Sequence, residues 1–190
     1  MRLMFVPESF QRGGIMIVIG DKAPEFIMKG VLKGKVSEYS LKQFKGKWVI
    51  LFFYPKDFTF VCPTEVKGFN KLHLEFKKIN AEILGVSVDP VEMHKEWVDE
   101  LGGLDYPLLS DPDRKVSAAY GVLNPKEQVA IRASFIIGPD SVIQCGSAYS
   151  SNVGRSVAET LRVLKALQTG RMCPADWKPG DETFETELKY

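Results

Sequence analysis

The sequence predicts an α/β domain with a mixed central β-sheet flanked by helices. Short apolar runs rich in aromatic and β-branched residues alternate with segments in which apolar residues recur every three or four positions. These patterns are typical of buried strands and amphipathic helices. Strands joined through helices tend to be parallel, whereas a short turn near Pro139 requires an antiparallel pair. With 190 residues, 45% of them hydrophobic, the chain is long enough for one domain with a full core.

The first half of the chain predicts two strand–helix units. Pro63 suits the first turn of a helix, where its missing N–H costs nothing. Asp89 is placed as an N-cap, with Pro90 at the first helical position and Glu92 as the acid that follows. The expected elements are a strand at 48–54, a helix from Cys62 to about Ile79, a strand at 83–88, and a helix from Asp89 to Gly102-Gly103.

The second half predicts a short helix, a hairpin and a final helix. Gly138-Pro139-Asp140 is a turn signal between two apolar runs. Ser156-Val157-Ala158-Glu159 is a capping box, and Gly170 is a helix stop. The expected elements are a helix from Asp111 towards Tyr120, strands at 133–137 and 142–146, and a helix from 156 to 170 with Val157, Leu161, Leu164 and Leu167 facing inward.

Three segments of different character divide the chain. Residues 1–15 contain Arg2 and Arg12 but lack the long apolar region of a secretory signal; we expect a short extension, with Met16 as an alternative start. Residues 16–170 are expected to form the domain. Residues 171–190, rich in proline, glycine and charge, are expected to form an arm outside the core.

Composition excludes several classes of function. The net charge is +1 with both signs interspersed, which gives no nucleic-acid footprint. No apolar stretch approaches the roughly 20 residues that span a bilayer. No phosphate loop or zinc spacing is found, so neither a cofactor nor a metal is expected. Three widely spaced cysteines favour catalytic thiols in a reducing compartment, and we expect a cytoplasmic location.

Cys62 is the main candidate for chemistry. It lies where the strand pattern ends and the helix pattern begins, and the N–H groups at the start of a helix favour a thiolate. A lone cysteine is also often a small buried hydrophobe. A thioredoxin-like dithiol is disfavoured because Cys62-Pro63-Thr64-Glu65 has no second cysteine.

The surroundings of Cys62 resemble the active-site signature of a known family. Pro55, Thr59 and Cys62 form the pattern Pro-x-x-x-Thr-x-x-Cys, followed by Pro-Thr-Glu. This pattern, with Asp21-Lys22-Ala23-Pro24-Glu25-Phe26 and 173–180, Cys-Pro-Ala-Asp-Trp-Lys-Pro-Gly, is similar to typical two-cysteine peroxiredoxins, the alkyl hydroperoxide reductase and thiol-specific antioxidant type. The resemblance implies a thioredoxin-like fold and a thiol-dependent peroxidase that protects against peroxides.

The resemblance also implies roles for single residues. Thr59 would offer its hydroxyl to a peroxide oxygen and Pro55 would shield the thiolate. Thr59 is also a turn threonine and Pro55 a strand terminator, and the two readings can hold together. Arg132, just before the apolar strand at 133–137, matches the active-site arginine; Arg155 resembles a second arginine that orders it. Glu65 is expected to pair with one of these two arginines.

Cys173 is the resolving thiol that the resemblance implies. After peroxide oxidises Cys62 to a sulfenic acid, Cys173 of a partner subunit would form a disulfide with it. The family builds such homodimers, commonly assembled into decamers, and is recycled by thioredoxin or a flavoprotein disulfide reductase. Because a disulfide requires close approach of two sulfurs, the helix at Cys62 must unwind locally.

The remaining cysteine and both histidines have no predicted catalytic role. Cys145 ends a strand pattern and is expected to be an inert structural thiol. His73 lies eleven residues beyond Cys62 on one helix, about 16 Å away, which argues against a Cys-His dyad. His94, in a charge-rich helix, is expected to be exposed. Four aromatic residues are expected to be core or subunit contacts and not a cofactor site: Phe52, Phe58, Phe60 and Trp177.

The chain departs from family members that over-oxidise easily. Their Gly-Gly-Leu-Gly loop is matched only in part by Gly102-Gly103-Leu104-Asp105, and the tail has Phe184 and Tyr190 but no adjacent Tyr-Phe pair. We therefore expect resistance to sulfinic acid formation. A chaperone or redox-relay activity is the second hypothesis of function, and a dithiol–disulfide isomerase is disfavoured.

Overall fold

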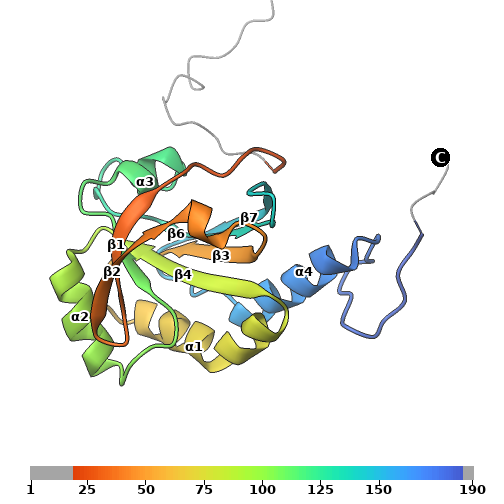
Figure 1. The fold of residues 1–190 in the computed structure, drawn as a ribbon, viewed down its shortest axis with the longest axis horizontal. Helices are drawn as coiled ribbons and strands as arrows, with labels where there is room; N and C mark the ends of the chain where they lie inside the picture. The colour runs from red at the N-terminus through yellow and green to blue at the C-terminus, as the bar shows by residue number, and fades with distance from the viewer. Residues whose placement is uncertain (1–18, 186–190) are drawn as a thin grey trace, which may run out of the picture.

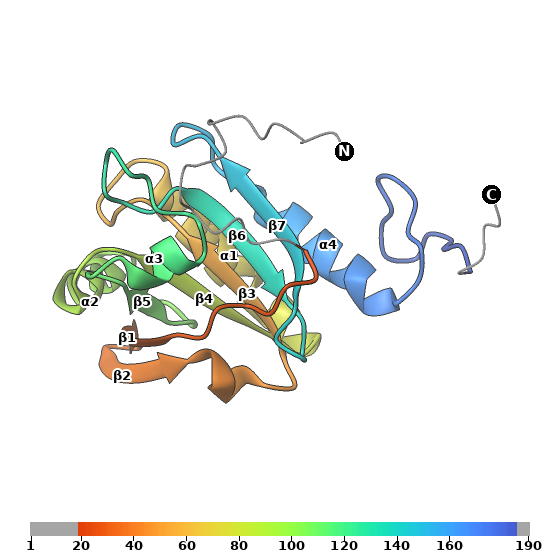
Figure 2. The same cartoon turned by 90° about the horizontal axis from the view of Figure 1, so that it is seen from above.

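The computed structural model describes residues 19–185, which contain a seven-stranded mixed sheet with flanking helices (Figures 1 and 2). The strand order is β2-β1-β5-β4-β3-β6-β7. β3, β4 and β5 run parallel to one another, and the other neighbouring pairs are antiparallel. The predicted fold class is confirmed. The extension at 1–15, Met16 and Tyr190 lie outside the described residues.

The elements follow one another as the alternating pattern predicts, with three additional strands. In chain order they are β1 (Ile27–Leu32), β2 (Lys35–Ser40), the 3-10 helix η2 (Leu41–Phe44), β3 (Trp48–Phe53), α1 (Cys62–Lys78), β4 (Ala81–Ser87), α2 (Val91–Glu100), β5 (Leu108–Ser110), α3 (Lys115–Ala119), β6 (Arg132–Ile137), β7 (Ile143–Tyr149) and α4 (Val157–Thr169).

Three strands, β1, β2 and β5, were not predicted from the sequence. β2, at the edge of the sheet, is mostly exposed and lacks a continuous apolar run. β5 is only three residues long, so its pairing with β4 and β1 identifies it as a strand, and no local pattern does. α3 is also shorter than expected. Arg114 has a left-handed backbone with φ 62°, so the helix begins only at Lys115, and the Asp111 carboxylate accepts hydrogen bonds from the N–H groups of Val116 and Ser117 in its first turn.

β3 separates the two halves of the core. Side chains alternate across a strand, so Val49, Leu51 and Phe53 pack on one face of the sheet, while Ile50 and Phe52 pack on the other with residues of α1, α2 and α4. All five side chains are at most 1% exposed. The predicted buried strand is therefore the central scaffold on which the site is built.

The helix ends show two confirmed predictions and one wrong one. Ser156 caps α4 and accepts a hydrogen bond from the Glu159 N–H at 3.1 Å, and Gly170 ends the helix at φ 63°. Asp89 was predicted to cap α2, which is wrong. Pro90 occupies the N-cap position, because the Asp89 carboxylate accepts hydrogen bonds from the Ser87 hydroxyl and the Asp57 N–H.

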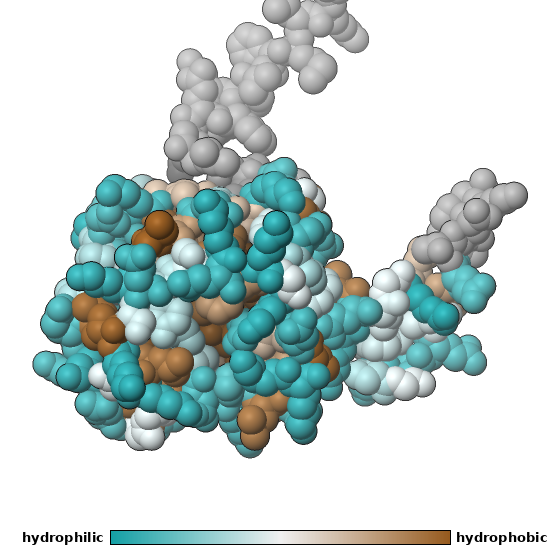
Figure 3. Space-filling model, in the orientation of Figure 1, coloured by the Kyte–Doolittle hydropathy of each residue, from teal (hydrophilic) through white to brown (hydrophobic). Residues whose placement is uncertain are grey.

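The surface of the described residues is mixed in character. On the face seen in Figure 3, hydrophobic side chains lie in separate small patches among hydrophilic ones. Residues 171–185 extend from the end of α4 away from the sheet (Figures 1 and 2), with Met172 and Phe184 paired through their backbones. Within residues 19–185 no helix combines the length and apolarity that a membrane crossing requires.

Candidate active site

Cys62 is the first residue of α1, as predicted, and follows the loop at 54–61 that leaves β3. Its side chain is 1% exposed and belongs to the apolar cluster between the sheet and α1. The first N–H groups of a helix have no partners within the helix and form its positive end. Burial alone would disfavour a negative sulfur, so further cationic groups are needed to stabilise a thiolate here.

Arg132 supplies the nearest cationic group. It is the first residue of β6, which pairs antiparallel with β3 in the register Phe53–Ala133, and this pairing brings residues 70 positions apart together. Its Nη1 lies 3.8 Å from the Cys62 Sγ, and its side chain is 2% exposed. Its Nη2 donates to the Ser151 carbonyl at 3.0 Å. The guanidinium is therefore held against the sulfur in a dry site, where charge interactions are strong.

Glu65 joins Arg132 to Arg155. Its Oε2 accepts from Arg132 Nη1, and its Oε1 accepts from both the side-chain Nε and the backbone N–H of Arg155, at 2.9 and 2.8 Å. All three side chains are at most 2% exposed. Glu65 was expected to pair with one arginine, and it pairs with both. Two guanidinium charges face one carboxylate, and the remaining positive charge lies beside Cys62.

Arg155 ties this cluster to the sheet. Its guanidinium donates to the carbonyls of Ala133 and Phe53, both at 2.6 Å, and to the Ser134 hydroxyl at 2.7 Å. It also lies over the ring of Phe52, 5.1 Å from its centre. Burial lowers the pKa of Arg155, and the charge of Glu65 opposes that shift. Arg155 therefore fixes Glu65, which in turn fixes Arg132.

Pro55 and Thr59 lie on the loop before Cys62. Pro55 is half-buried and Thr59 is exposed. The Thr59 hydroxyl donates to the Lys56 carbonyl at 3.2 Å, within the loop itself. Of the aromatic residues on this loop, Phe58 is 48% and Phe60 is 98% exposed. The structure therefore brings Cys62, Glu65, Arg132 and Arg155 into one cluster, with Thr59 bonded to its own loop.

Comparison with known proteins identifies the family to which the chain belongs. Residues 19–145 match the AhpC/TSA family. The chain is 46% identical over 183 residues to the chloroplastic 2-Cys peroxiredoxin BAS1 of Hordeum vulgare, covering 90% of this chain and 87% of the relative. It is 43% identical over 184 residues to alkyl hydroperoxide reductase C of Mycolicibacterium smegmatis, covering 89% and 94%. The chain belongs to the AhpC/TSA family and is a peroxiredoxin, a thiol-dependent peroxidase.

Solved structures of peroxiredoxins have the same fold. The reduced 2-Cys peroxiredoxin of Plasmodium vivax superposes with a TM-score of 0.82 at 37% identity, covering 87% of this chain and 91% of that one. Mycobacterium tuberculosis AhpC superposes with a TM-score of 0.75 at 42% identity, covering 80% and 99%. The thioredoxin-like fold that the resemblance implies is thus confirmed.

The structure of this peroxiredoxin contains a second buried charge cluster that the sequence analysis missed. His94 was predicted to be exposed, which is wrong: its side chain is 0% exposed, and its Nδ1 lies 2.6 Å from Oδ2 of Asp57. The other oxygen of Asp57 accepts a hydrogen bond from the Tyr54 hydroxyl at 2.8 Å. The one available signal was Asp57, an acid within a loop of aromatic residues, but its partner is 37 positions away.

The other two cysteines, Cys145 and Cys173, lie outside the cluster formed by Cys62, Glu65, Arg132 and Arg155. Cys145 is half-buried on β7, and burial, with a smaller contribution from Glu159, raises the pKa of its thiol. Cys173 is half-buried next to α4, with its Sγ 3.5 Å from the Thr169 hydroxyl oxygen, and it lines a cavity of about 350 Å³. All three cysteines are free thiols.

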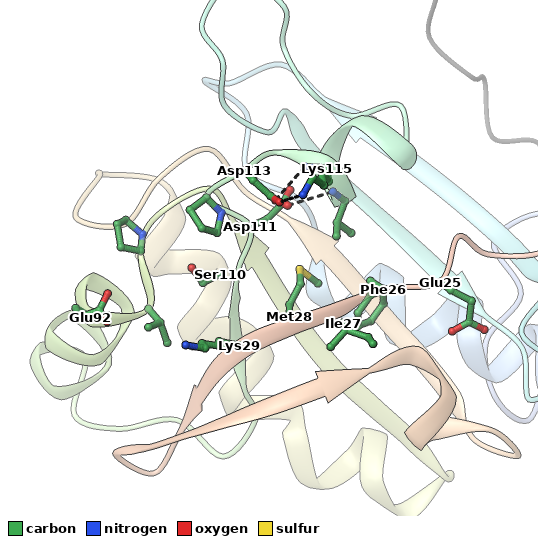
Figure 4. A pocket seen from close by; sticks show the side chains of 14 residues that line it. Glu25, Phe26, Ile27, Met28, Lys29, Glu92, Ser110, Asp111, Asp113 and Lys115 are labelled. Atoms are coloured by element: carbon green, nitrogen blue, oxygen red, sulfur yellow. Dashed lines mark hydrogen bonds and ion pairs between the residues drawn. The ribbon is translucent and has the colours of Figure 1, made fainter.

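A cavity of about 590 Å³ lies elsewhere, between β1, the start of α2 and the loop before α3 (Figure 4). Its acidic side chains include Asp111, which is 1% exposed and bonded to Ser117 and Val116. None of the predicted site residues lines it. Across residues 19–185, no group of three or more acidic, cysteine or histidine side chains is arranged to hold a metal ion.

Proposed function

We propose that Cys62 is the thiol with which this peroxiredoxin reduces hydrogen peroxide and organic hydroperoxides. The observation that carries the proposal is the guanidinium of Arg132, 3.8 Å from the sulfur at a helix start. The thiolate attacks one peroxide oxygen and forms an S–O bond while the O–O bond breaks. The other oxygen leaves as hydroxide or alkoxide and takes up a proton to give water or an alcohol. Cys62 becomes a sulfenic acid.

The cationic cluster would also stabilise the departing oxygen. Among the described residues, Arg132 Nε has no hydrogen-bond partner although it is buried, and such an unpaired donor is costly unless a ligand uses it. A peroxide oxygen provides that acceptor, and the donor is already in place when negative charge develops. Pro55 would shield the sulfur, and Thr59 would contribute its hydroxyl after releasing the Lys56 carbonyl. Glu65 and Arg155 act by positioning Arg132.

We further propose that Cys173 of a partner subunit resolves the sulfenic acid. Its thiol would displace the hydroxyl group as water and form an intersubunit disulfide, and a dithiol donor, thioredoxin or a flavoprotein disulfide reductase, would then reduce it. Because Cys62 is 1% exposed, the first turn of α1 must unwind before the sulfurs meet. This chemistry requires a homodimer, and a decamer is the assembly expected from the resemblance, with residues 171–190 as the exchanging arm.

Stopped-flow oxidation of the reduced protein tests the proposal. Cys62→Ser should abolish the fast reaction with hydrogen peroxide, whereas Cys173→Ser should retain it but accumulate the sulfenic acid. On non-reducing electrophoresis, peroxide-treated wild type should migrate as a disulfide-linked dimer, and each variant as a monomer. A fast oxidation that survives Cys62→Ser would refute the assignment of Cys62. An exclusively monomeric wild type would refute resolution between subunits.

We propose a cytoplasmic location, because three widely spaced cysteines favour catalytic thiols in a reducing compartment. The chaperone or redox-relay hypothesis predicts a different result for the same variant. Suppression of protein aggregation should survive Cys62→Ser, whereas peroxide turnover should not.

A further inference from the structure

We propose that the buried pair of Asp57 and His94 is a positioning device for the catalytic loop, and that it sets the N-terminal limit of the segment that unwinds. The inference rests on the proposed role of Cys62. It adds Asp57 and His94. Within residues 19–185, neither side chain forms a hydrogen bond or ion pair with Cys62, Arg132 or Arg155. The loop before Cys62 carries Pro55 and Thr59, so whatever fixes this loop fixes the wall of the site.

The protons of the pair follow from its hydrogen bonds. His94 Nε2 lies 3.1 Å from the Leu109 carbonyl oxygen, which can only accept, so Nε2 carries a hydrogen. His94 Nδ1 lies 2.6 Å from Oδ2 of Asp57. One further proton is therefore shared between ring and carboxyl, and its ionic form is an imidazolium beside a carboxylate. The short contact is typical of a charge-assisted hydrogen bond.

The groups around the pair act on the carboxyl of Asp57 in opposite directions. Burial raises the pKa of Asp57, and the hydrogen bond and charge of His94 oppose that shift. Tyr54 donates its hydroxyl hydrogen to Asp57, which stabilises the carboxylate. Asp89, the other acid facing this group, accepts the backbone N–H of Asp57 at 2.9 Å and the Ser87 hydroxyl at 2.6 Å. Its charge adds to the rise in the pKa of Asp57.

The pair attaches the loop to two elements that are distant in sequence. His94 belongs to α2, and Leu109, which receives its second hydrogen bond, belongs to β5. Asp57 is thus held through its side chain by α2 and through its backbone N–H by Asp89, two residues beyond the end of β4. Two independent bonds at one loop residue restrict both its position and its orientation.

Asp57 and Glu65 bracket a short segment that contains no buried ion pair of its own among the described residues. Both are buried, with 5% and 3% of their surface exposed, and each is held by an ion pair. Between them, Phe58, Thr59 and Phe60 are exposed, and Cys62 lies next to them. The structure thus assigns residues 58–64 as the segment that can leave the core while both ends stay anchored.

Kinetics of two variants test the device. His94→Gln and Asp57→Asn each remove one charge while keeping a similar size and polarity. In each we expect the second-order rate constant for oxidation of Cys62 by hydrogen peroxide to fall about tenfold. Disulfide formation with Cys173 should become severalfold faster, because a loosened loop unwinds more readily. The double variant should lose little more than either single one, since the two residues act as a unit.

Ser117→Ala is the matched control. Ser117 is also buried and hydrogen-bonded to an acid, Asp111, but it lies on α3. It should lose stability without changing either rate constant. If the His94 and Asp57 variants behave like this control, with lowered stability and an unchanged ratio of the two rates, the positioning role is refuted.

Nuclear magnetic resonance tests the pair without turnover. The chain has only two histidines, so His73→Gln assigns the ring signals. In the reduced protein, the hydrogen between His94 Nδ1 and Asp57 Oδ2 should give a ring N–H signal that is protected from exchange with solvent, and this signal should be lost in Asp57→Asn. Absence of the signal from the reduced wild type would overturn the positioning role of the pair. Peroxide oxidation unaffected by Cys62→Ser would instead overturn the proposed function.

Discussion

Two buried clusters of ionisable side chains lie on either side of Cys62 in the sequence. They differ in the ratio of basic to acidic groups. On the C-terminal side of Cys62, two arginines share the single carboxylate of Glu65, and the excess positive charge faces the sulfur. On the N-terminal side of Cys62, Asp57 and His94 are paired one to one, and Asp57 also accepts a hydrogen bond from the Tyr54 hydroxyl. An excess charge is useful where negative charge develops during a reaction. A balanced pair is suited to holding a loop without altering the potential at the sulfur.

The largest effect should come from removing the excess charge. Arg132→Gln should lower the rate constant for Cys62 oxidation by about a hundredfold to a thousandfold, the size typical of losing one preorganised donor to a developing anion. Stopped-flow mixing with hydrogen peroxide measures it. Arg132→Lys is the control: it keeps the charge but not the fork of donors, and should recover part of the rate. A glutamine variant as fast as wild type would contradict the proposed role.

The second prediction separates the stability of the fold from the rate of Cys62 oxidation. Glu65→Gln should destabilise the fold by about 3–5 kcal/mol, because it leaves two buried guanidinium groups without a carboxylate. The Ser151 carbonyl still accepts a hydrogen bond from Arg132, so Arg132 keeps part of its positioning, and oxidation of Cys62 in the folded fraction should fall less than in Arg132→Gln. Urea unfolding and stopped-flow oxidation on the same samples check this. Intact stability in Glu65→Gln would mean that the arginines find other partners.

A smaller effect is expected at the balanced cluster. Tyr54→Phe removes the hydroxyl that donates to Asp57 at 2.8 Å and leaves a buried carboxylate oxygen unpaired, which should cost about 1–3 kcal/mol. Burial, reinforced by Asp57, raises the pKa of Tyr54 well above its ordinary value, so the donor stays protonated and the cost should be constant from pH 6 to 9. Urea unfolding across that range measures it; a cost that vanishes at pH 9 would contradict the assignment.

The smallest effect belongs to an ion-pair cluster outside the site. Glu82 accepts hydrogen bonds from Lys47 and Lys77 at 2.7 and 2.8 Å. Burial raises its pKa, but the two lysines outweigh burial and lower it. A lowered folded pKa adds stability at pH values above the ordinary carboxyl pKa, and this stability is lost as pH falls through the folded pKa. Glu82→Gln should therefore cost about 0.2–1 kcal/mol at pH 7.

That cost should shrink as the pH falls below about 4.5, the ordinary value for Glu82. Urea unfolding at pH 7 and pH 4 compares the two conditions, and Cys62 oxidation at pH 7 should stay unchanged. A larger cost at pH 4 than at pH 7 would reverse the predicted sign. A slowed oxidation would mean that the cluster is coupled to the site.

Prediction from sequence succeeded where the deciding signal was local. The run of apolar residues at β3, the Ser156 cap and the Gly170 stop are patterns over a few neighbouring residues, and each appears in the structure. Cys62 at a helix start follows from the change of period at one point. β5 and the true start of α2 were missed because partners distant in the chain determine them: β4 and β1 for β5, and the Asp57 N–H for Asp89.

The amino-acid sequence by itself determined the α/β class, the sulfur at the start of α1 and the family, because hydrophobic period, helix punctuation and motif spacing are written along the chain. Only the tertiary structure decided that Glu65 binds both arginines and that His94 is buried against Asp57. These contacts span 37 to 90 positions, and antiparallel pairing of β3 with β6 and the packing of α2 bring them together. The physical reason is that a buried charge must find its partner in space, and no local pattern records which partner that is.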